Sequence, residues 1–252
     1  AMDDTPGTLL LLRHGESVYN ASSTFTGLLD VELTRAGERQ VGVAAQLIRE
    51  AGLHPDLLIR SPMLRAIRTA ELLIEDLRIA GVPTQTTWRL SERDYGCLTG
   101  VSKKEARARY GEEAFFAWRR TMHGRPPAAS PEQLATWSSP APLGDVGPLH
   151  AGVGESLHDV VERVTPLWQE LRERLTRGSC LFVVSHGNTL RALCAAMIGL
   201  SDHETERLNI PAGHPLVFHV DANGQVHPRK GVYLDHTAAQ TAAAQVAAEG
   251  GT

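Results

Sequence analysis

Short apolar runs alternate along this chain with longer segments in which apolar residues recur at helical spacing. Four consecutive leucines fall within residues 8–12, and comparable runs occupy 57–59, 180–184 and 215–220. Apolar runs this short, bounded by polar turns, are typical of strands buried on both faces. Strands that alternate with helices predict an α/β three-layer sandwich, in which helices cover both faces of a mostly parallel central sheet.

Capping residues mark several helix starts. Thr34 caps a predicted helix that ends before Gly52, and Ser61 followed by Pro62 supplies the cap and first turn of a helix reaching about residue 80. The other predicted elements are a strand at 84–90 and helices at 102–111, 157–175 and 188–200.

The chain is predicted to form one domain. Residues 1–7 are interpreted as a cloning remnant and an N-terminal tail, and 8–236 as the single domain. Proline, alanine, serine and glycine dominate 123–154, which predicts a loop-rich insert. The alanine-rich 237–252 is predicted to be a mobile C-terminal tail.

Composition narrows the class of protein. The formal net charge of −4 argues against a general polyanion binder, so neither nucleic acid nor a membrane surface is expected as a partner. The three cysteines form no C-x-x-C pair and are interpreted as reduced thiols of a cytoplasmic protein. The four-leucine run is too short for a membrane span.

Two of the predicted strands end in a histidine followed at once by glycine. The leucine run leads into Arg13-His14-Gly15, and "CLFVV" leads into Ser185-His186-Gly187. One such histidine is more often structural, but two at equivalent ends of core strands favour a ligand site, because open parallel sheets bind ligands there. Glycine allows a ligand to approach the backbone closely, and a helix N-terminus behind it suits phosphate.

The basic residues favour an anion over a metal at this site. Arg13 precedes the first histidine, Arg65 and Arg68 lie in the first turns of a predicted helix, and Arg119 and Arg120 are adjacent. Guanidinium groups bind phosphate or carboxylate bidentately. No carboxylate or cysteine stands at metal-ligand spacing from either histidine, so no metal is expected.

Seven blocks of sequence resemble a known family. They are "LLRHGES", "FTG", "RSPMLRAIRTA", "LSERDYGCLTG", "KKEARARYGEEAFFAWRR", "SHGNTLRAL" and "LNIPAGHPLVF", and the resemblance they carry extends over roughly residues 8–122 and 154–236, which is most of the chain. In this order they resemble the cofactor-dependent phosphoglycerate mutases of the histidine phosphatase superfamily. The resemblance implies a phosphoglycerate mutase-like fold and interconversion of 3-phosphoglycerate and 2-phosphoglycerate in glycolysis and gluconeogenesis. It also implies 2,3-bisphosphoglycerate as primer and intermediate, no metal, and a homodimer or homotetramer.

The resemblance also implies roles for individual residues. His14 would be the nucleophile that becomes phosphohistidine, and Glu92 the general acid/base for the substrate hydroxyl. Arg13, Arg65 and His186 would surround the transferring phosphoryl group. The residues that would bind substrate are Ser17, Asn20, Thr26, Gly27, Arg93, Tyr95, Lys103, Arg119, Arg120, Gly187 and Asn188.

Three features depart from the family pattern. Tyr19 stands where tryptophan is common, and Asp94 stands where many members carry histidine, which would place a negative charge beside the site. The segment 123–154 is largely unlike the family. Two alternatives therefore stay open: a phosphatase that passes the phosphoryl group from His14 to water, and a catalytically silent sensor of phosphorylated metabolites.

Overall fold

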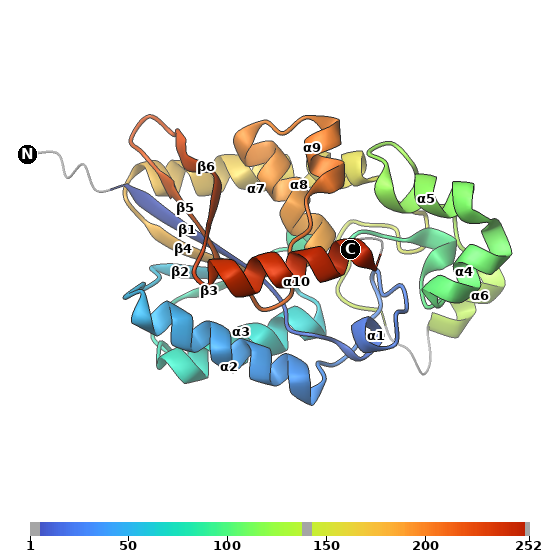
Figure 1. Cartoon of the computed structure of the whole chain (residues 1–252), viewed down its shortest axis with the longest axis horizontal. Helices are drawn as coiled ribbons and strands as arrows, with labels where there is room; N and C mark the ends of the chain where they lie inside the picture. The colour runs from blue at the N-terminus through green and yellow to red at the C-terminus, as the bar shows by residue number, and fades with distance from the viewer. Residues whose placement is uncertain (1–5, 138–142, 250–252) are drawn as a thin grey trace, which may run out of the picture.

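The computed structural model describes residues 6–137 and 143–249. Its core is a six-stranded sheet in the order β3-β2-β4-β1-β5-β6 (Figure 1). The strands are β1 (Gly7–Arg13), β2 (Leu57–Arg60), β3 (Thr84–Thr86), β4 (Cys180–Ser185), β5 (Leu216–Val220) and β6 (Val226–Tyr233). The first four are mutually parallel, β5 runs antiparallel to its neighbour β1, and β6 runs antiparallel to β5 and so in the same direction as the first four. The predicted α/β sandwich with a mostly parallel sheet is confirmed.

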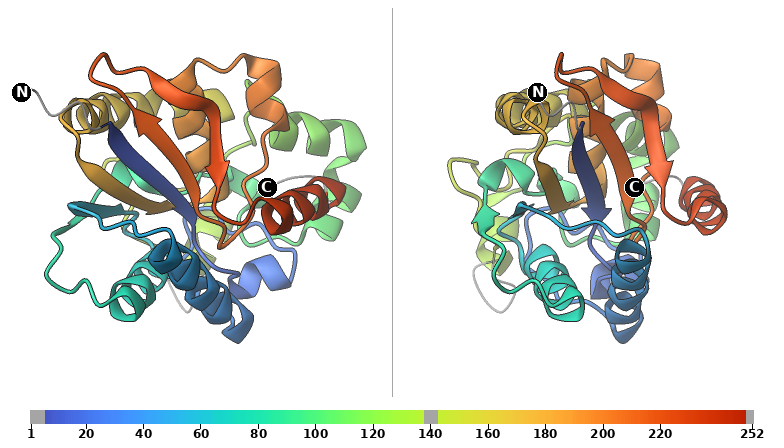
Figure 2. Two further views of the ribbon diagram at one scale, coloured as in Figure 1. Left: turned by 60° about the vertical axis from the view of Figure 1, so that its left-hand side comes forward. Right: turned by 90° about the vertical axis from the view of Figure 1, so that its left-hand side faces the viewer.

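Helices cover both faces of the sheet (Figure 2). Leu10 and Leu12 of β1 pack with α2 (Arg35–Glu50) and α3 (Leu64–Leu77) on one face. Leu9 and Leu11 pack with α7 (Leu157–Thr176) and α8 (Gly187–Ile198) on the other. Alternate leucines point to opposite faces of a strand, so a continuous apolar run is what a strand between two helical layers requires.

The remaining helices lie at the edges of the sandwich. They are α1 (Val18–Ala21), α4 (Lys103–Tyr110), α5 (Glu112–Arg120), α6 (Pro131–Trp137), α9 (Asp202–Arg207) and α10 (His236–Ala248), with 3-10 turns at Trp88–Leu90 and Gly96–Leu98. Around α4 and α5, Phe25, Tyr95 and Phe115 form a separate apolar cluster. None of the helices within 6–137 and 143–249 is both long and apolar enough to cross a bilayer.

Two local predictions were wrong. The strand expected at 84–90 ends at Thr86, and its last three residues turn into the 3-10 helix. Helix α3 begins at Leu64 with Met63 as the N-cap, so Ser61 does not cap it. The Ser61 hydroxyl instead contacts His186, a partner 125 positions away that local sequence cannot reveal.

The C-terminal segment forms helix α10 up to Ala248. Asp235 caps it by accepting a hydrogen bond from the Ala238 amide. Figure 1 shows the helix lying in front of the sheet, with its end directed toward α1 and α4. The mobility expected for 237–252 stays a prediction, and residues 250–252 of that tail lie outside the described residues, as do 138–142 of the insert.

Candidate active site

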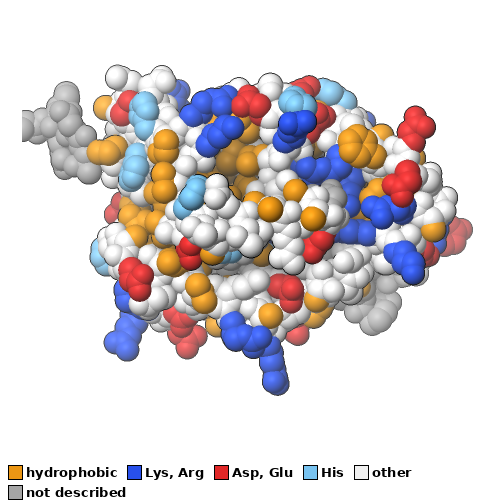
Figure 3. All heavy atoms as spheres, in the orientation of Figure 1, with side chains coloured by type: hydrophobic (Ala, Val, Ile, Leu, Met, Phe, Trp, Pro, Cys, Tyr) orange, Lys and Arg blue, Asp and Glu red, His pale blue; other side chains and the backbone are white. Residues whose placement is uncertain are grey.

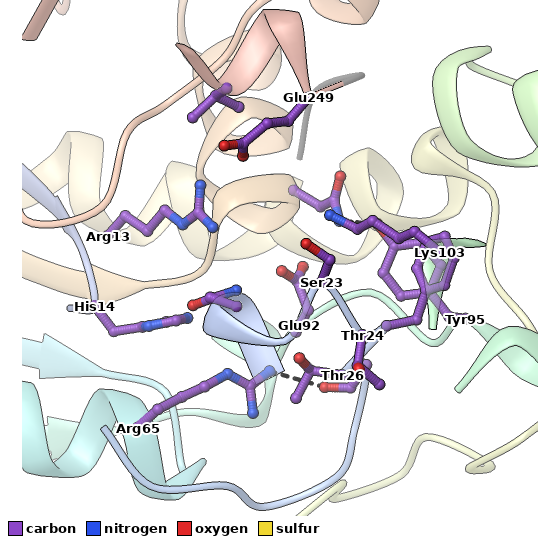
Figure 4. Close-up of a pocket in the computed structure, with 15 residues that line it drawn as sticks. Arg13, His14, Ser23, Thr24, Thr26, Arg65, Glu92, Tyr95, Lys103 and Glu249 are labelled. Atoms are coloured by element: carbon purple, nitrogen blue, oxygen red, sulfur yellow. Dashed lines mark hydrogen bonds between the residues drawn. The ribbon is translucent and has the colours of Figure 1, made fainter. Parts of the chain in front are cut away.

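A pocket opens at the carboxyl end of β1, where the parallel strands end. Figure 4 shows Arg13, His14 and Arg65 projecting side by side into it, with Glu249 approaching from the end of α10. The residues that line it are Arg13, His14, Asn20, Ser23, Thr24, Phe25, Thr26, Gly27, Arg65, Glu92, Tyr95, Lys103, Asn188, Val246 and Glu249. Ten of these fifteen were predicted from sequence as site residues: Arg13, His14, Asn20, Thr26, Gly27, Arg65, Glu92, Tyr95, Lys103 and Asn188.

His14 is held in one tautomer by its own turn. Its Nδ1 lies 2.7 Å from the carbonyl oxygen of Gly15. A carbonyl only accepts hydrogen bonds, so Nδ1 carries the proton and donates it. The lone pair of the neutral ring is therefore on Nε2, which is available to attack an electrophile.

Burial and positive neighbours keep His14 neutral. The side chain is 3% exposed, and burial, followed by the charges of Arg65 and Arg13, holds its pKa well below the ordinary histidine value. A protonated imidazole has no lone pair on Nε2. The same arginines that would attract an anion therefore also preserve the nucleophilic form of His14.

His186 lies beside His14, with the ring centroids 5.0 Å apart. Its pKa is also held well below the ordinary value, first by burial and then by Arg65, His14 and Arg13. Arg13 and Ser185 are paired across β1 and β4, so the strand register itself brings the two histidines together.

Ser61 fixes the orientation of His186. The Ser61 Oγ is 2.7 Å from His186 Nε2 and also accepts a hydrogen bond from the Met63 amide at 3.1 Å. Within the described part of the chain, Nε2 is the one acceptor found for the Ser61 hydroxyl proton, so we assign that proton to Nε2 and the imidazole proton of His186 to Nδ1. Among the described residues, Nδ1 is buried and has no partner. It is thus an N–H donor without an acceptor beside the nucleophile.

Two arginines supply positive charge beside His14. Arg65, in the first turn of α3, is 2% exposed and donates to the carbonyl oxygens of Leu29 (2.8 Å) and Gly27 (2.9 Å). Burial lowers the Arg65 pKa to about 10, so it remains charged at neutral pH. Arg13 donates to the Ile210 carbonyl at 2.9 Å. Within the described chain neither forms an ion pair, so both charges are available to an anion.

Glu92 contributes the carboxylate of the pocket. Its Oε1 accepts a hydrogen bond from the Arg93 amide at 2.7 Å and lies 3.4 Å from the Thr189 hydroxyl. Glu92 and His14 therefore line one pocket from different segments of the fold. A carboxyl and a neutral imidazole in this arrangement can combine nucleophilic attack with proton transfer.

A second cluster of predicted residues lies on the opposite wall. Asn188 donates to the Tyr95 hydroxyl at 2.7 Å. Lys103 has its pKa lowered to about 8, chiefly by burial and then by the charges of Arg119 and Arg13. Lys103 thus lies within a field of positive charge, as expected for a group that meets an anion.

Other predicted residues do not line the pocket. Ser17 caps α1, where its side chain accepts from the Asn20 amide at 3.1 Å. Arg93 is fully buried and donates to the carbonyl oxygens of Glu155 (2.8 Å), Trp118 and Gly124. Gly187 is the first residue of α8.

Arg119 and Arg120 face a neighbouring hollow rather than the pocket. The hollow is lined by Arg107, Arg119, Arg120 and Arg207, and Figure 3 shows basic side chains gathered on this face near the end of α10. Arg120 donates to the Glu206 carbonyl. Arg119 donates to the Glu249 carbonyl at 3.4 Å, so the last turn of α10 stands between these arginines and the pocket.

The expected role of glycine after the first histidine was wrong. A Cβ on Gly15 would lie 2.3 Å from the Gly37 carbonyl oxygen, and the Gly15 amide donates to the Thr69 hydroxyl at 3.2 Å. Gly15 is needed for the close approach of α2, and its amide is not free for a ligand.

Asp94 does not place its charge in the pocket. Its carboxylate accepts hydrogen bonds from the amides of Gly96 (2.9 Å), Gly152 (2.9 Å) and Gly154 (3.2 Å). Burial raises the pKa of this carboxyl. Asp94 therefore connects the end of the insert to the loop that carries Glu92.

Several pocket residues were missed by sequence reasoning. Ser23 and Thr24 directly precede the recognised "FTG" block and Phe25 is its first residue, so the block could have indicated them. Val246 belongs to α10 and Glu249 is its C-cap, and the alanine-rich sequence of this helix contains no signal of a binding role. Among the described residues, no group of three or more histidine, cysteine or acidic side chains is arranged to hold a metal ion.

The sequence comparison agrees with this geometry. The family model of the histidine phosphatase superfamily (branch 1) matches residues 9–229. The chain belongs to this superfamily. Its relatives in the histidine phosphatase superfamily include the 2,3-bisphosphoglycerate-dependent phosphoglycerate mutase of Corynebacterium jeikeium, which is 41% identical over 98% of this chain and 97% of that protein. The enzyme of the same name from Clavibacter sepedonicus is also 41% identical, over 97% of this chain and 98% of that protein.

Solved structures of the superfamily share the fold. The mycobacterial glucosyl-3-phosphoglycerate phosphatase complexed with VO3 is similar with a TM-score of 0.65 and 26% identity, covering 84% of this chain and 92% of that chain.

Proposed function

We propose that this chain is a 2,3-bisphosphoglycerate-dependent phosphoglycerate mutase, which interconverts 3-phosphoglycerate and 2-phosphoglycerate. The observation that carries the proposal is the neutral His14, with its Nε2 lone pair free, between two unpaired arginines and in one pocket with Glu92. The mutases named above, similar over nearly the whole chain, supply the substrate class.

In the proposed mechanism His14 Nε2 attacks phosphorus and forms phosphohistidine. Arg13, Arg65 and the Nδ1–H of His186 stabilise the negative charge that develops on the phosphoryl oxygens. Glu92 donates a proton to the departing ester oxygen and takes one from the attacking hydroxyl in the return step.

The substrate's other anionic groups are proposed to meet the opposite wall. Lys103 supplies charge there, and Asn20, Thr26, Gly27, Tyr95 and Asn188 supply neutral polar groups. This cationic pocket with an unpaired buried N–H fits a small, doubly phosphorylated acid such as 2,3-bisphosphoglycerate. The last turn of α10 separates Arg119 and Arg120 from the pocket, and we propose that it moves when these arginines contact such a ligand.

We propose that Ser17, Arg93 and Gly187 hold neighbouring parts of the site in place and do not contact the substrate. Ser17 holds Asn20 at the start of α1, and Arg93 anchors the segment beside Glu92. A homodimer or homotetramer, a cytoplasmic location and a role in glycolysis and gluconeogenesis stay predictions.

The decisive assay follows both products. The protein is supplied with 3-phosphoglycerate and a trace of 2,3-bisphosphoglycerate, and 2-phosphoglycerate and free phosphate are measured together. The proposal requires 2-phosphoglycerate to form well ahead of phosphate.

A phosphatase is the second candidate. It is favoured by the fold shared with a phosphatase that acts on a phosphoglycerate ester, and by the divergent insert at 123–154. Rapid phosphate release without 2-phosphoglycerate would establish it in place of the mutase.

A further inference from the structure

A buried ion pair lies behind the wall of the pocket. Arg163 of α7 is 7% exposed and Glu155, just before the helix, is 13% exposed. Arg163 Nε lies 3.0 Å from Glu155 Oε2, and Nη2 lies 3.1 Å from Oε1. Neither residue lines the pocket, so neither can touch a ligand there directly.

The guanidinium of Arg163 binds the backbone on which Glu92 is carried. Nη1 donates to the carbonyl oxygens of Arg89 (2.8 Å) and Ser91 (2.9 Å), and Nη2 donates to that of Glu92 itself (2.9 Å). Arg89 returns a bond to the Arg163 carbonyl at 2.8 Å. One rigid, planar side chain thus fixes three carbonyl groups within four residues.

Glu155 holds the other side of the same segment. Its Oε1 accepts a hydrogen bond from the Asp94 amide at 2.8 Å, while its backbone carbonyl accepts from Arg93 Nε at 2.8 Å. The Arg163–Glu155 pair therefore contacts the chain before, at and after Glu92.

Stability alone does not account for this arrangement. A buried ion pair gains little over well-packed apolar residues, because desolvation offsets the Coulomb attraction. What apolar residues cannot supply is a set of directed hydrogen bonds to loop carbonyls and an amide. Such bonds fix the backbone from which the Glu92 side chain extends, and small displacements of a catalytic group are costly.

We propose that Arg163 and Glu155 are positioning residues for Glu92, required for its proton transfer and not for phosphoryl transfer as such. This inference rests on the proposed function. When His14 Nε2 forms its bond to phosphorus, the P–O ester bond breaks and its electron pair stays on the ester oxygen. A departing alkoxide must take the proton of the Glu92 carboxyl, whereas 4-nitrophenolate is a stable anion and needs none.

The test compares two phosphoryl donors in single-turnover experiments. The full-length protein receives either 2,3-bisphosphoglycerate or 4-nitrophenyl phosphate, and phosphohistidine formation is followed. Glu155→Gln, which keeps the side chain's size but removes its charge, is expected to slow transfer from the bisphosphoglycerate roughly 10- to 100-fold. Transfer from the nitrophenyl ester should change by less than about threefold, because it uses no general acid.

Two further variants should give a larger effect and no effect, respectively. Glu92→Gln should show the same donor selectivity with a larger loss, roughly 10²–10⁴-fold. Arg172→Gln is the matched control, since Arg172 lies on the same helix but donates to the carbonyl oxygens of Gly224 and Asn223. It should leave both rates unchanged.

The outcomes separate the two proposals. If Glu155→Gln slows phosphoryl transfer equally from both donors, or slows it from neither, the positioning role is wrong. Arg163→Lys, which keeps the charge but not the planar set of donors, should reproduce the donor selectivity of Glu155→Gln. If neither donor labels His14 in the unaltered protein, the proposed function itself fails and this inference fails with it.

Discussion

The ends of β1 and β4 carry the same His-Gly pair but present opposite nitrogens to the pocket. His14 donates its Nδ1 proton to the Gly15 carbonyl and leaves Nε2 as a bare lone pair. His186 has its Nε2 occupied by Ser61, which leaves Nδ1 as an unpartnered N–H. One histidine is thereby prepared as a nucleophile and the other as a donor. Their different chemistry comes from the partner of each ring and not from the motif.

The largest expected effect comes from removing the nucleophilic ring. His14→Ala should abolish phosphohistidine formation and reduce turnover roughly 10⁶-fold, to background, while the protein stays folded. Labelled 2,3-bisphosphoglycerate and a thermal melt measure the two properties. His158, whose side chain is 44% exposed and lies outside the pocket, serves as the control when it is replaced by alanine. Persistent label in His14→Ala would assign the nucleophile elsewhere, and loss of folded protein would assign His14 a structural role.

A smaller loss of transfer rate is expected when His186, the hydrogen-bond donor, is replaced. His186→Gln should reduce the rate of transfer roughly 10²–10³-fold, the usual effect of removing one donor to a charge that develops in the transition state. His14 should nevertheless still become labelled, slowly. If the His186→Gln variant takes up no label over long incubation, the assignment of His14 as nucleophile and His186 as hydrogen-bond donor is wrong.

Ser61→Ala tests whether the Ser61 hydroxyl alone determines that His186 presents a protonated Nδ1 to the pocket, whereas His14 presents an unprotonated Nε2. Losing a hydrogen bond of about 1–1.5 kcal/mol predicts a rate reduction of roughly five- to tenfold. The ¹⁵N chemical shifts of His186 should move toward a mixture of tautomers, while those of His14 stay unchanged. Ser201→Ala, which removes the cap of α9, is the matched control. Unchanged His186 shifts in Ser61→Ala would exclude this account of the tautomer.

The last expected effect concerns stability at acid pH and not the rate of transfer. Both histidines have folded-state pKa values well below the ordinary value of about 6.5, so below that pH the unfolded chain binds protons that the folded chain does not. Stability should therefore be fully present above about pH 6.5 and fall as the pH decreases, by up to about 1.4 kcal/mol per histidine and pH unit. Urea denaturation at pH 7.5 and 5.5 measures this. A double His14→Gln, His186→Gln variant should lose much of the dependence, and equal dependence in both proteins would contradict it.

Much of the framework could be predicted from the sequence because its causes are local. Continuous leucines in β1 require two helical layers, and the 3.6-residue period of α2 and α7 supplies them. The edge strand β6 escaped prediction because its largely exposed residues show no apolar pattern. Helix α10 was not predicted for a similar reason, since alanine repeats carry little information about which part of the protein they pack against.

By itself the sequence determined that two histidines would meet at one edge of a parallel sheet, since chain direction and strand register follow from local pattern and topology. Only the tertiary structure decided which nitrogen each ring presents, that Gly15 serves packing against Gly37, and that Glu249 reaches the pocket. These depend on contacts between residues far apart in the chain. Hydrogen bonds and close packing act over a few ångströms in space, and no spacing along the sequence encodes them.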